Sequence, residues 1–99
     1  MNAKAIPTIS EIKEKTTPIL MRYGATRAGV FGSVARGGTN PRSDVDILVE
    51  LPEPIGLFGF VGLKQELEKA LGRKVDLVEY EAIKSRIRDR ILAEEVPIL

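Results

Sequence analysis

Apolar residues recur along this chain with two spacings, and short polar breaks separate the segments in which each spacing holds. Apolar positions three and four residues apart predict helices over residues 8–23, 57–71 and 81–95. Short runs rich in β-branched residues predict strands over residues 26–31, 45–51 and 74–79. A one-turn helix is expected over residues 34–36, and the composition of residues 37–42 is typical of a loop.

The first helical segment carries signals for its start, its interior and its end. Thr8 and Glu11 fit a capping box, in which each side chain bonds the backbone N–H of the other. Pro18 lies inside the pattern, and Thr17 before it could cap a second helix that begins at Pro18. We therefore expect a kinked or broken helix that ends at Gly24.

The order of these elements predicts an α/β (α+β) fold in which helices pack on a small mixed β-sheet. The helix between the second and third strands makes their connection a crossover, which favours a parallel pair. Residues 1–99 are expected to form one domain with one core. The apolar tail, residues 96–99, either packs back on the domain or meets a partner.

Candidate chemistry gathers around the first two strands. The first strand runs into Gly32 and Ser33, where a tight turn and the N–H groups of a helix start would suit a phosphate. The second strand follows Asp44 and contains Asp46, and side chains two residues apart on a strand share one face. Paired carboxylates repel unless a cation lies between them, and Mg²⁺ is held by carboxylate oxygens together with substrate phosphates.

Asp76 adds a third carboxylate in the third strand, between Val75 and Leu77. A carboxylate buried among apolar neighbours is costly unless it is paired or metal-bound. If the third strand lies beside the second, Asp76 can join Asp44 and Asp46, and three carboxylates suit a two-metal phosphoryl or nucleotidyl transfer. Each aspartate alone could instead be a turn residue or an arginine partner.

The combination Gly32-Ser33-Val34-Ala35-Arg36-Gly37, a spacer, and Ser43-Asp44-Val45-Asp46 resembles the signature of polymerase-beta-like nucleotidyltransferases. The chain most resembles the minimal nucleotidyltransferase (MNT) antitoxins that pair with HEPN-domain toxins, and the resemblance extends over nearly all of it. It implies the nucleotidyltransferase fold, with the first two strands antiparallel. It also implies transfer of AMP from ATP to a tyrosine hydroxyl of a partner toxin, an RNase that the modification silences.

The resemblance assigns a role to each matching residue. Asp44 and Asp46 would hold two Mg²⁺ ions, and Asp76 would lie near one ion and accept the proton of the attacking hydroxyl. Gly32 and Ser33 would bind the terminal phosphates. Three further residues are weaker nucleotide-binding candidates: Arg36 and Arg42, which could equally form surface salt bridges, and Ser43, which could cap the turn into Asp44.

Composition narrows the classes of site and partner. The chain has no cysteine and no histidine, so any metal must be held by oxygen ligands. A net charge of +1 gives no overall attraction to nucleic acid or membrane. The absence of a long apolar segment predicts a cytoplasmic protein without a membrane span.

Other functions compete with catalysis on a HEPN partner. Lys84, Arg86, Arg88 and Arg90 form either a solvated face or a contact surface for RNA or an acidic partner. An antitoxin that only binds and masks the toxin would use this face and the tail, and transfer to a small molecule such as an aminoglycoside is a third possibility. Because so short a domain has few walls for a pocket, a partner subunit or a second copy is expected to complete the site.

Overall fold

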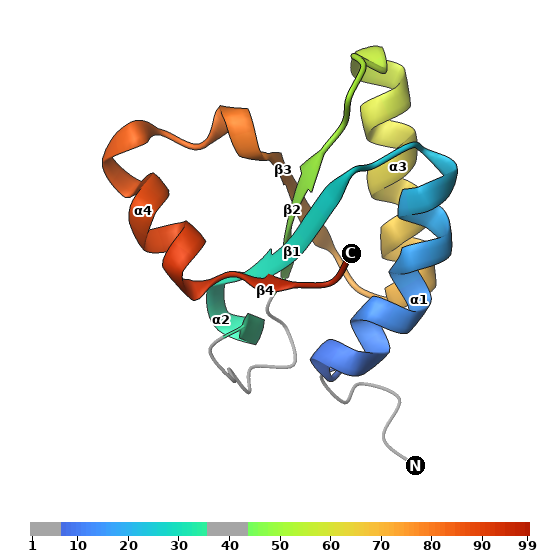
Figure 1. Ribbon diagram of the computed structural model, residues 1–99. Coiled ribbons are helices and arrows are strands. Elements are labelled where there is room, and N and C mark those ends of the chain that lie inside the picture. The colour runs from blue at the N-terminus through green and yellow to red at the C-terminus, as the bar shows by residue number, and fades with distance from the viewer. Residues whose placement is uncertain (1–6, 36–43) are drawn as a thin grey trace.

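The computed structural model describes residues 7–35 and 44–99. Within these residues, the strands form a four-stranded sheet in the order β3-β2-β1-β4 (Figure 1). The strands are β1 (Arg27–Phe31), β2 (Val45–Glu50), β3 (Val75–Glu79) and β4 (Val96–Pro97). The helices are α1 (Ile9–Arg22), α2 (Gly32–Ala35), α3 (Gly56–Leu71) and α4 (Ser85–Glu94), with a 3₁₀ turn η1 (Tyr80–Ala82).

The sheet is mixed, as expected. β2 pairs with β3 in parallel, whereas β1 pairs with β2 and with β4 antiparallel. The parallel pair follows from the crossover through α3, and the antiparallel pair of β1 and β2 agrees with the family resemblance. The predicted α/β class and the mixed sheet with packed helices are confirmed.

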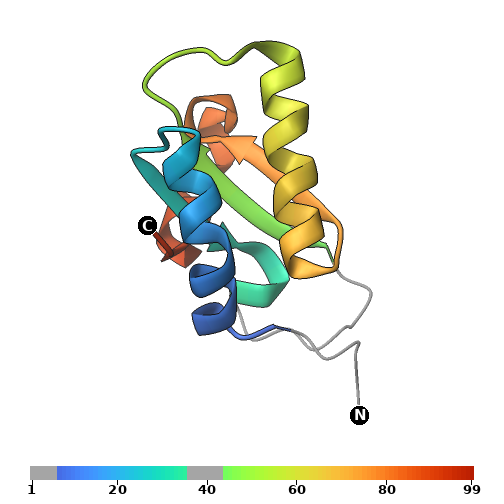
Figure 2. The same cartoon turned by 90° about the vertical axis from the view of Figure 1, so that its right-hand side faces the viewer.

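The two faces of the sheet are covered unequally. Figure 2 shows α1 and α3 side by side across one face, and Figure 1 shows α4 on the other. The core under α1 and α3 includes Ile12, Leu20, Ile47, Leu63 and Leu67, all completely buried. A smaller cluster around Leu48, Tyr80 and Ile83 lies on the α4 face, which we call the second face.

The first helix, α1, runs without a break from Ile9 to Arg22, so of the expected kink or break at Pro18 the break is wrong. Thr8 and Glu11 make the expected capping box, but Thr17 donates its hydroxyl to the carbonyl of Lys13 at 2.6 Å and caps nothing. A proline removes one helical hydrogen bond. Buried side chains before and after it, among them Ile12 and Leu20, keep α1 on the sheet despite that loss.

The predicted final helix over residues 81–95 is confirmed only for residues 85–94, because the helical conformation is interrupted at Ile83. Ile83 and Lys84 have extended backbones between η1 and α4. Ile83 is buried in the second-face cluster, and its carbonyl accepts a hydrogen bond from Arg88 at 3.1 Å. Burial of this side chain therefore outweighs the helical periodicity around it.

The tail packs back on the domain, which was one of its two expected outcomes. Val96 and Pro97 pair with β1 as a strand that the sequence analysis does not predict. Ile98 is completely buried and donates its N–H to the carbonyl of Ala28 at 3.0 Å. The tail thus closes the β1 edge of the sheet.

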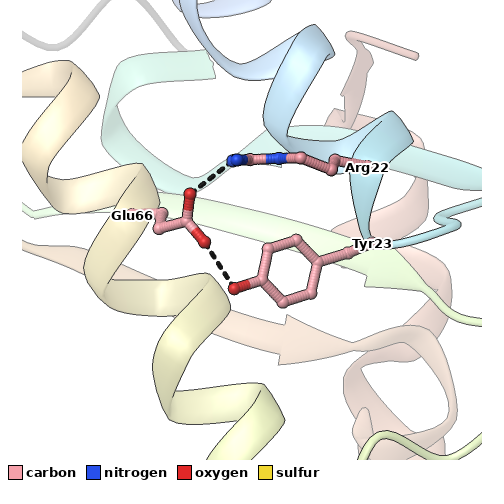
Figure 3. Close-up of polar contacts among 3 residues, drawn as sticks. All are labelled: Arg22, Tyr23 and Glu66. Atoms are coloured by element: carbon pink, nitrogen blue, oxygen red, sulfur yellow. Dashed lines mark hydrogen bonds and ion pairs between the residues drawn. The ribbon is translucent and has the colours of Figure 1, made fainter.

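Interhelical contacts fix α1 against α3 (Figure 3). Glu66 on α3 accepts hydrogen bonds from Arg22 and from the Tyr23 hydroxyl, the latter at 2.5 Å. The hydrogen bond from Tyr23 and the Arg22 guanidinium lower the pKa of Glu66, and the same bond to Glu66 raises the pKa of Tyr23. This trio links the C-terminal end of α1 to α3 on the face away from α4.

Candidate active site

Asp46 and Asp76 are direct partners in the parallel pairing of β2 and β3. Each stands between inward-pointing apolar residues, so both carboxylates point to the second face of the sheet. Strand neighbours in a sheet lie about 4.8 Å apart, a spacing at which one cation can be shared by two carboxylates. The fold therefore brings together two residues thirty positions apart, as the sequence analysis expects.

The two carboxylates differ in exposure. Asp46 is half-buried, whereas Asp76 is exposed. Val75 and Leu77 are buried as expected, but strand alternation sends the Asp76 side chain to the surface, so the expected cost of a buried carboxylate does not arise there. Its open position leaves room for a substrate beside it.

Gly32 allows Asp46 to take its position. The backbone of Gly32 has φ +71°, a conformation that residues with a Cβ rarely adopt. A Cβ built on Gly32 would lie less than 3.0 Å from Oδ2 of Asp46, closer than real Cβ contacts. The turn after β1 and the carboxylate of β2 are thus packed directly against each other, and any side chain at position 32 would require this carboxylate to move.

Asp44 lies next to β2, and its side chain is exposed. Within the described ranges, no three acidic side chains converge closely enough to form a metal-binding group as they lie. The pair Asp46 and Asp76 on the second face, with Asp44 two residues before Asp46, nevertheless offers only oxygen ligands, a donor set that fits Mg²⁺. The metal role of the three aspartates stays a prediction.

The other predicted site residues are only partly described. Gly32 and Ser33 begin α2, so this helix starts two residues earlier than the expected range 34–36. Arg36, Arg42 and Ser43 lie outside the described residues. Their nucleotide-binding roles remain predictions, as does the contact of Ser33 with phosphate.

A cavity of about 260 Å³ adjoins this site. Its lining comes from the end of β1 and from α4: Phe31, Gly32, Ile87, Arg90, Ile91 and Glu94. Phe31 is the strand partner of Asp46, so the cavity opens beside that carboxylate. Sequence analysis missed this wall, although the spacing of Ile87 and Ile91 marks one face of α4.

A larger hollow of about 820 Å³ lies at the opposite end of β2 and β3. Leu51, Ile55, Phe60 and Leu77 line it together with the start of α3. The carboxylates lie at the start of β2 and β3, whereas this hollow adjoins their ends. Size alone therefore does not identify the site, and the placement of Asp46 and Asp76 does.

One further carboxylate on the second face, that of Glu95, is buried and already paired within the fold. Glu95 is 4% exposed, pairs with Arg27 at 3.1 Å and accepts the Tyr80 hydroxyl. Arg27 also stacks over the Tyr80 ring at 4.2 Å. Burial, followed by the hydrogen bond to Glu95, raises the pKa of Tyr80 above its ordinary range. These satisfied groups support the fold beneath the site.

The model of the nucleotidyltransferase domain family matches residues 11–98 of this chain. A relative from Methanocaldococcus jannaschii, provisionally named a protein adenylyltransferase, is 48% identical over 91 residues, covering 92% of this chain and 98% of its own. The protein adenylyltransferase MntA of Thermococcus cleftensis is 41% identical over 96 residues, covering 93% and 97%.

Solved structures of similar fold also include nucleotidyltransferases. A structure provisionally described as a minimal nucleotidyltransferase is 36% identical with a TM-score of 0.79, covering 92% of this chain and 96% of its own. One chain of a toxin–antitoxin complex with AMP-PNP is 22% identical with a TM-score of 0.77, and the match covers 88% of this chain and 72% of that one. The complex of a tri-AMPylated Shewanella oneidensis HEPN toxin with its MNT antitoxin is 19% identical with a TM-score of 0.72, covering 93% and 72%. The last two show similarity of fold.

No helix in residues 7–35 or 44–99 is long and apolar enough to cross a membrane.

Proposed function

This chain belongs to the nucleotidyltransferase domain family, and we propose that it is the antitoxin of a toxin–antitoxin pair, transferring AMP from ATP to a hydroxyl of its partner. The partner is a HEPN RNase toxin and the acceptor a tyrosine. The cytoplasm supplies the ATP. The observation that carries the proposal is the pairing of Asp46 with Asp76 on the second face of the sheet, with Asp46 directly beside Gly32.

The transfer forms one bond and breaks one bond at the α-phosphorus of ATP. The acceptor oxygen attacks the α-phosphorus of ATP, the bond from that phosphorus to the bridging oxygen of the β-phosphate breaks, and pyrophosphate leaves. Asp76 accepts the proton of the attacking hydroxyl, which its exposed position on β3 permits. Two Mg²⁺ ions held by Asp44, Asp46 and Asp76 would neutralise the phosphates and lower the pKa of the hydroxyl.

The remaining residues bind the nucleotide. Gly32 and Ser33 provide backbone N–H groups and a hydroxyl to the terminal phosphates, at the turn packed on Asp46. Arg36 and Arg42 would neutralise phosphate charge, and Ser43 is a further candidate for a nucleotide contact.

The comparisons support this assignment at two levels. The relatives that span nearly the same length bear the name protein adenylyltransferase, which names the reaction class for them. Structures of the same fold include complexes with AMP-PNP and with an AMPylated HEPN toxin. We extend the ATP substrate, the Mg²⁺ dependence and the toxin partner from those proteins to this chain.

The experiment uses ATP labelled on the α-phosphate, Mg²⁺ and the HEPN protein encoded nearest the gene. Label on the partner after denaturing electrophoresis, absent with the Asp44→Asn/Asp46→Asn double variant, supports the proposal. The exposed residue Glu53, far from the carboxylates at the end of β2, provides the control Glu53→Gln, which should transfer normally. An unlabelled partner, or label undiminished in the double variant, would refute it.

Masking by binding alone is the second candidate. Leu57 and Phe58 at the start of α3 are 75% and 92% exposed, and such apolar surface suits a protein contact. The triple variant with asparagine at Asp44, Asp46 and Asp76 separates the two functions. Toxin that stays suppressed by this variant indicates masking, and toxin released by it indicates catalysis.

A further inference from the structure

The larger hollow, at the ends of β2 and β3, is a part of the surface to which AMP transfer as proposed gives no ligand. Its volume is about 820 Å³, and its walls are mostly apolar, with Leu51, Ile55 and Phe60 among them. Leu57 lines it with a 75% exposed side chain, and the next residue, Phe58, is 92% exposed. Apolar side chains that continue from a hollow onto the surrounding surface are typical of a protein contact.

The charges around the hollow indicate the chemistry of its occupant. Glu53, Glu79 and Glu81 line it, and no Lys or Arg does. Among the residues that the structure describes, none of these three carboxylates forms an ion pair. Their field repels a nucleotide or an RNA, and a symmetric second copy would bring the same acidic rim against it. It attracts a protein segment that carries Lys or Arg.

The hollow also lies at a free edge of the sheet, because β3 is an outer strand in the order β3-β2-β1-β4. The Val45 N–H donates to the carbonyl of Lys74 at 3.0 Å. In a parallel ladder every second residue after Lys74 then faces β2 as well. The residues between them, Leu77 and Glu79 included, therefore turn their N–H and C=O groups to the free edge.

Only the last part of this edge is open to a partner. At its start, the Val75 N–H already donates to the Glu68 carboxylate at 2.9 Å. Leu77 and Glu79, in contrast, line the hollow. An extended segment that bonds these backbone groups would place alternate side chains against the apolar walls, as in other cases of strand addition.

Val78 connects the hollow to the candidate active site. It lines the hollow, and Asp76 lies two residues before it on β3. Side chains two residues apart on a strand point to the same face, about 6.6 Å from each other. A segment bound along this edge therefore passes close to Asp76, the residue that accepts the proton of the attacking hydroxyl in the proposed function.

We infer that the larger hollow and the adjoining edge of β3 bind the acceptor protein, through an extended segment that joins apolar side chains to Lys or Arg; this inference rests on the proposed function. The apolar side chains of that segment fill the hollow, and its cations meet Glu79 and Glu81. Its backbone bonds the edge at Leu77 and Glu79. This contact selects the acceptor protein and takes no part in binding ATP.

Titration calorimetry without ATP tests the apolar part of the contact, with the HEPN protein encoded nearest the gene as the ligand. The double variant Leu57→Ala/Phe58→Ala should bind it about tenfold more weakly, because a few apolar anchors supply most of the affinity of an interface. Met21→Ala removes a 65% exposed apolar side chain on α1, outside the hollow, and should bind as the wild type does. All three residues are exposed, and circular dichroism checks that the variants fold.

Charge reversal tests the acidic rim. Glu81→Lys should weaken binding about tenfold at low salt, and its difference from the wild type should shrink as salt is added, because salt screens exposed charges. Glu14→Lys makes the same change of charge at an exposed position of α1 that does not line the hollow, and it should bind nearly as the wild type does. Equal losses in the two variants would show an effect of net charge alone and would overturn the inference.

Amide hydrogen exchange, followed residue by residue by NMR, tests the strand edge without any substitution. The amides of Leu77 and Glu79 should exchange more slowly in the complex with the partner than in the free chain. Those of Asp76 and Val78, which face β2, should be protected in both. A complex in which Leu77 and Glu79 gain no protection would overturn the inference.

Kinetics separate this inference from the proposed function. Leu57→Ala/Phe58→Ala should raise KM for the acceptor protein about tenfold and leave kcat and KM for ATP unchanged. Glu53→Gln removes one rim charge of three, and at a saturating concentration of the partner its transfer stays normal. AMP transfer with an unchanged acceptor KM in the double variant would overturn the inference while the proposed function stands.

Two further outcomes concern the partner itself. A complex that protects Leu77 and Glu79, formed by a chain that transfers no AMP, would refute the proposed function and leave the docking surface intact. A dimer of this chain that Leu57→Ala/Phe58→Ala dissociates, with binding of the partner unchanged, would assign the hollow to a second copy and overturn the inference. A partner that does not bind at all would overturn both proposals.

Discussion

Substituting alanine for Gly32 tests whether the turn after β1 positions the carboxylate of Asp46. The substitution has two costs. At φ +71° a Cβ strains the backbone, which costs about 1–2 kcal/mol. The new Cβ would also occupy the space of Oδ2 of Asp46, so the carboxylate must leave the position that it has beside Gly32.

Gly24 provides a control that carries only the first cost. Its φ is +78°, close to that of Gly32, but a Cβ there meets no atom within 4 Å. Gly24→Ala should therefore destabilise the fold by about 1–2 kcal/mol and leave transfer unchanged. For a chain of this size each kcal/mol lowers Tm by about 4–8 °C, which thermal unfolding resolves.

The comparison of the two variants separates what Gly32 does in the site, next to Asp46, from the effect of backbone strain alone. We expect Gly32→Ala to slow AMP transfer about a hundredfold, since a displacement near 1 Å at a reacting group has that effect. Initial rates with the partner and labelled ATP, below the Tm of both variants, measure it. If Gly32→Ala transfers AMP as fast as Gly24→Ala, Asp46 does not need this position and the reasoning is refuted.

Three further predictions concern the framework of the site. Ile98→Ala should lower the free energy of unfolding in urea by about 2–5 kcal/mol, because Ile98 is completely buried beside β1. A loss no larger than that caused by substituting an exposed residue would contradict the packing of the tail on β1. Tyr80→Phe should cost about 1 kcal/mol, because it removes the hydrogen bond to Glu95. Since the pKa of Tyr80 is raised in the folded state, its hydroxyl contributes stability that is present below pH ~10 and is lost as pH rises through the folded pKa. Unfolding measured across the alkaline range, on wild type and Tyr80→Phe, follows this loss. The lowered pKa of Glu66 predicts stability that is present above pH ~4.3 and lost as pH falls through the folded pKa; acid unfolding of Glu66→Gln should lack this component, and an unchanged acid profile would argue against it.

Local rules predicted much of this fold. Strand alternation placed Asp46 and Asp76 on one face, and the crossover through α3 placed their strands side by side in parallel. The capping box at Thr8 is equally local. These inferences needed only the neighbours of each residue and the connection between two strands.

Long-range packing decided what the sequence did not predict. β4 is two residues long and exists because β1 offers it an edge, a fact absent from residues 96–99 themselves. Ile83 interrupts a helical pattern because Leu48 and Tyr80 form a pocket for it on the far side of the sheet. Pro18 is tolerated because the helix around it is anchored by buried side chains.

The site shows the same division. That Asp46 and Asp76 can meet follows from the crossover between their strands, but their register, the contact between Gly32 and Asp46, and the α4 wall require the folded coordinates. Ile87 lies 56 positions after Phe31, and its stripe on α4 is typical of an ordinary core face. Sequence reasoning thus identified the carboxylates and overlooked the cavity beside them.

Intact mass spectrometry of the partner protein, after incubation with this chain, ATP and Mg²⁺, tests the central claim most directly. The account predicts that the partner gains whole AMP units with the wild-type chain and none with Asp46→Asn or Asp76→Asn, while Glu53→Gln behaves as the wild type does. A partner of unchanged mass, or one that gains AMP equally with the two aspartate variants, would contradict the claim that the paired carboxylates on the second face carry out the transfer.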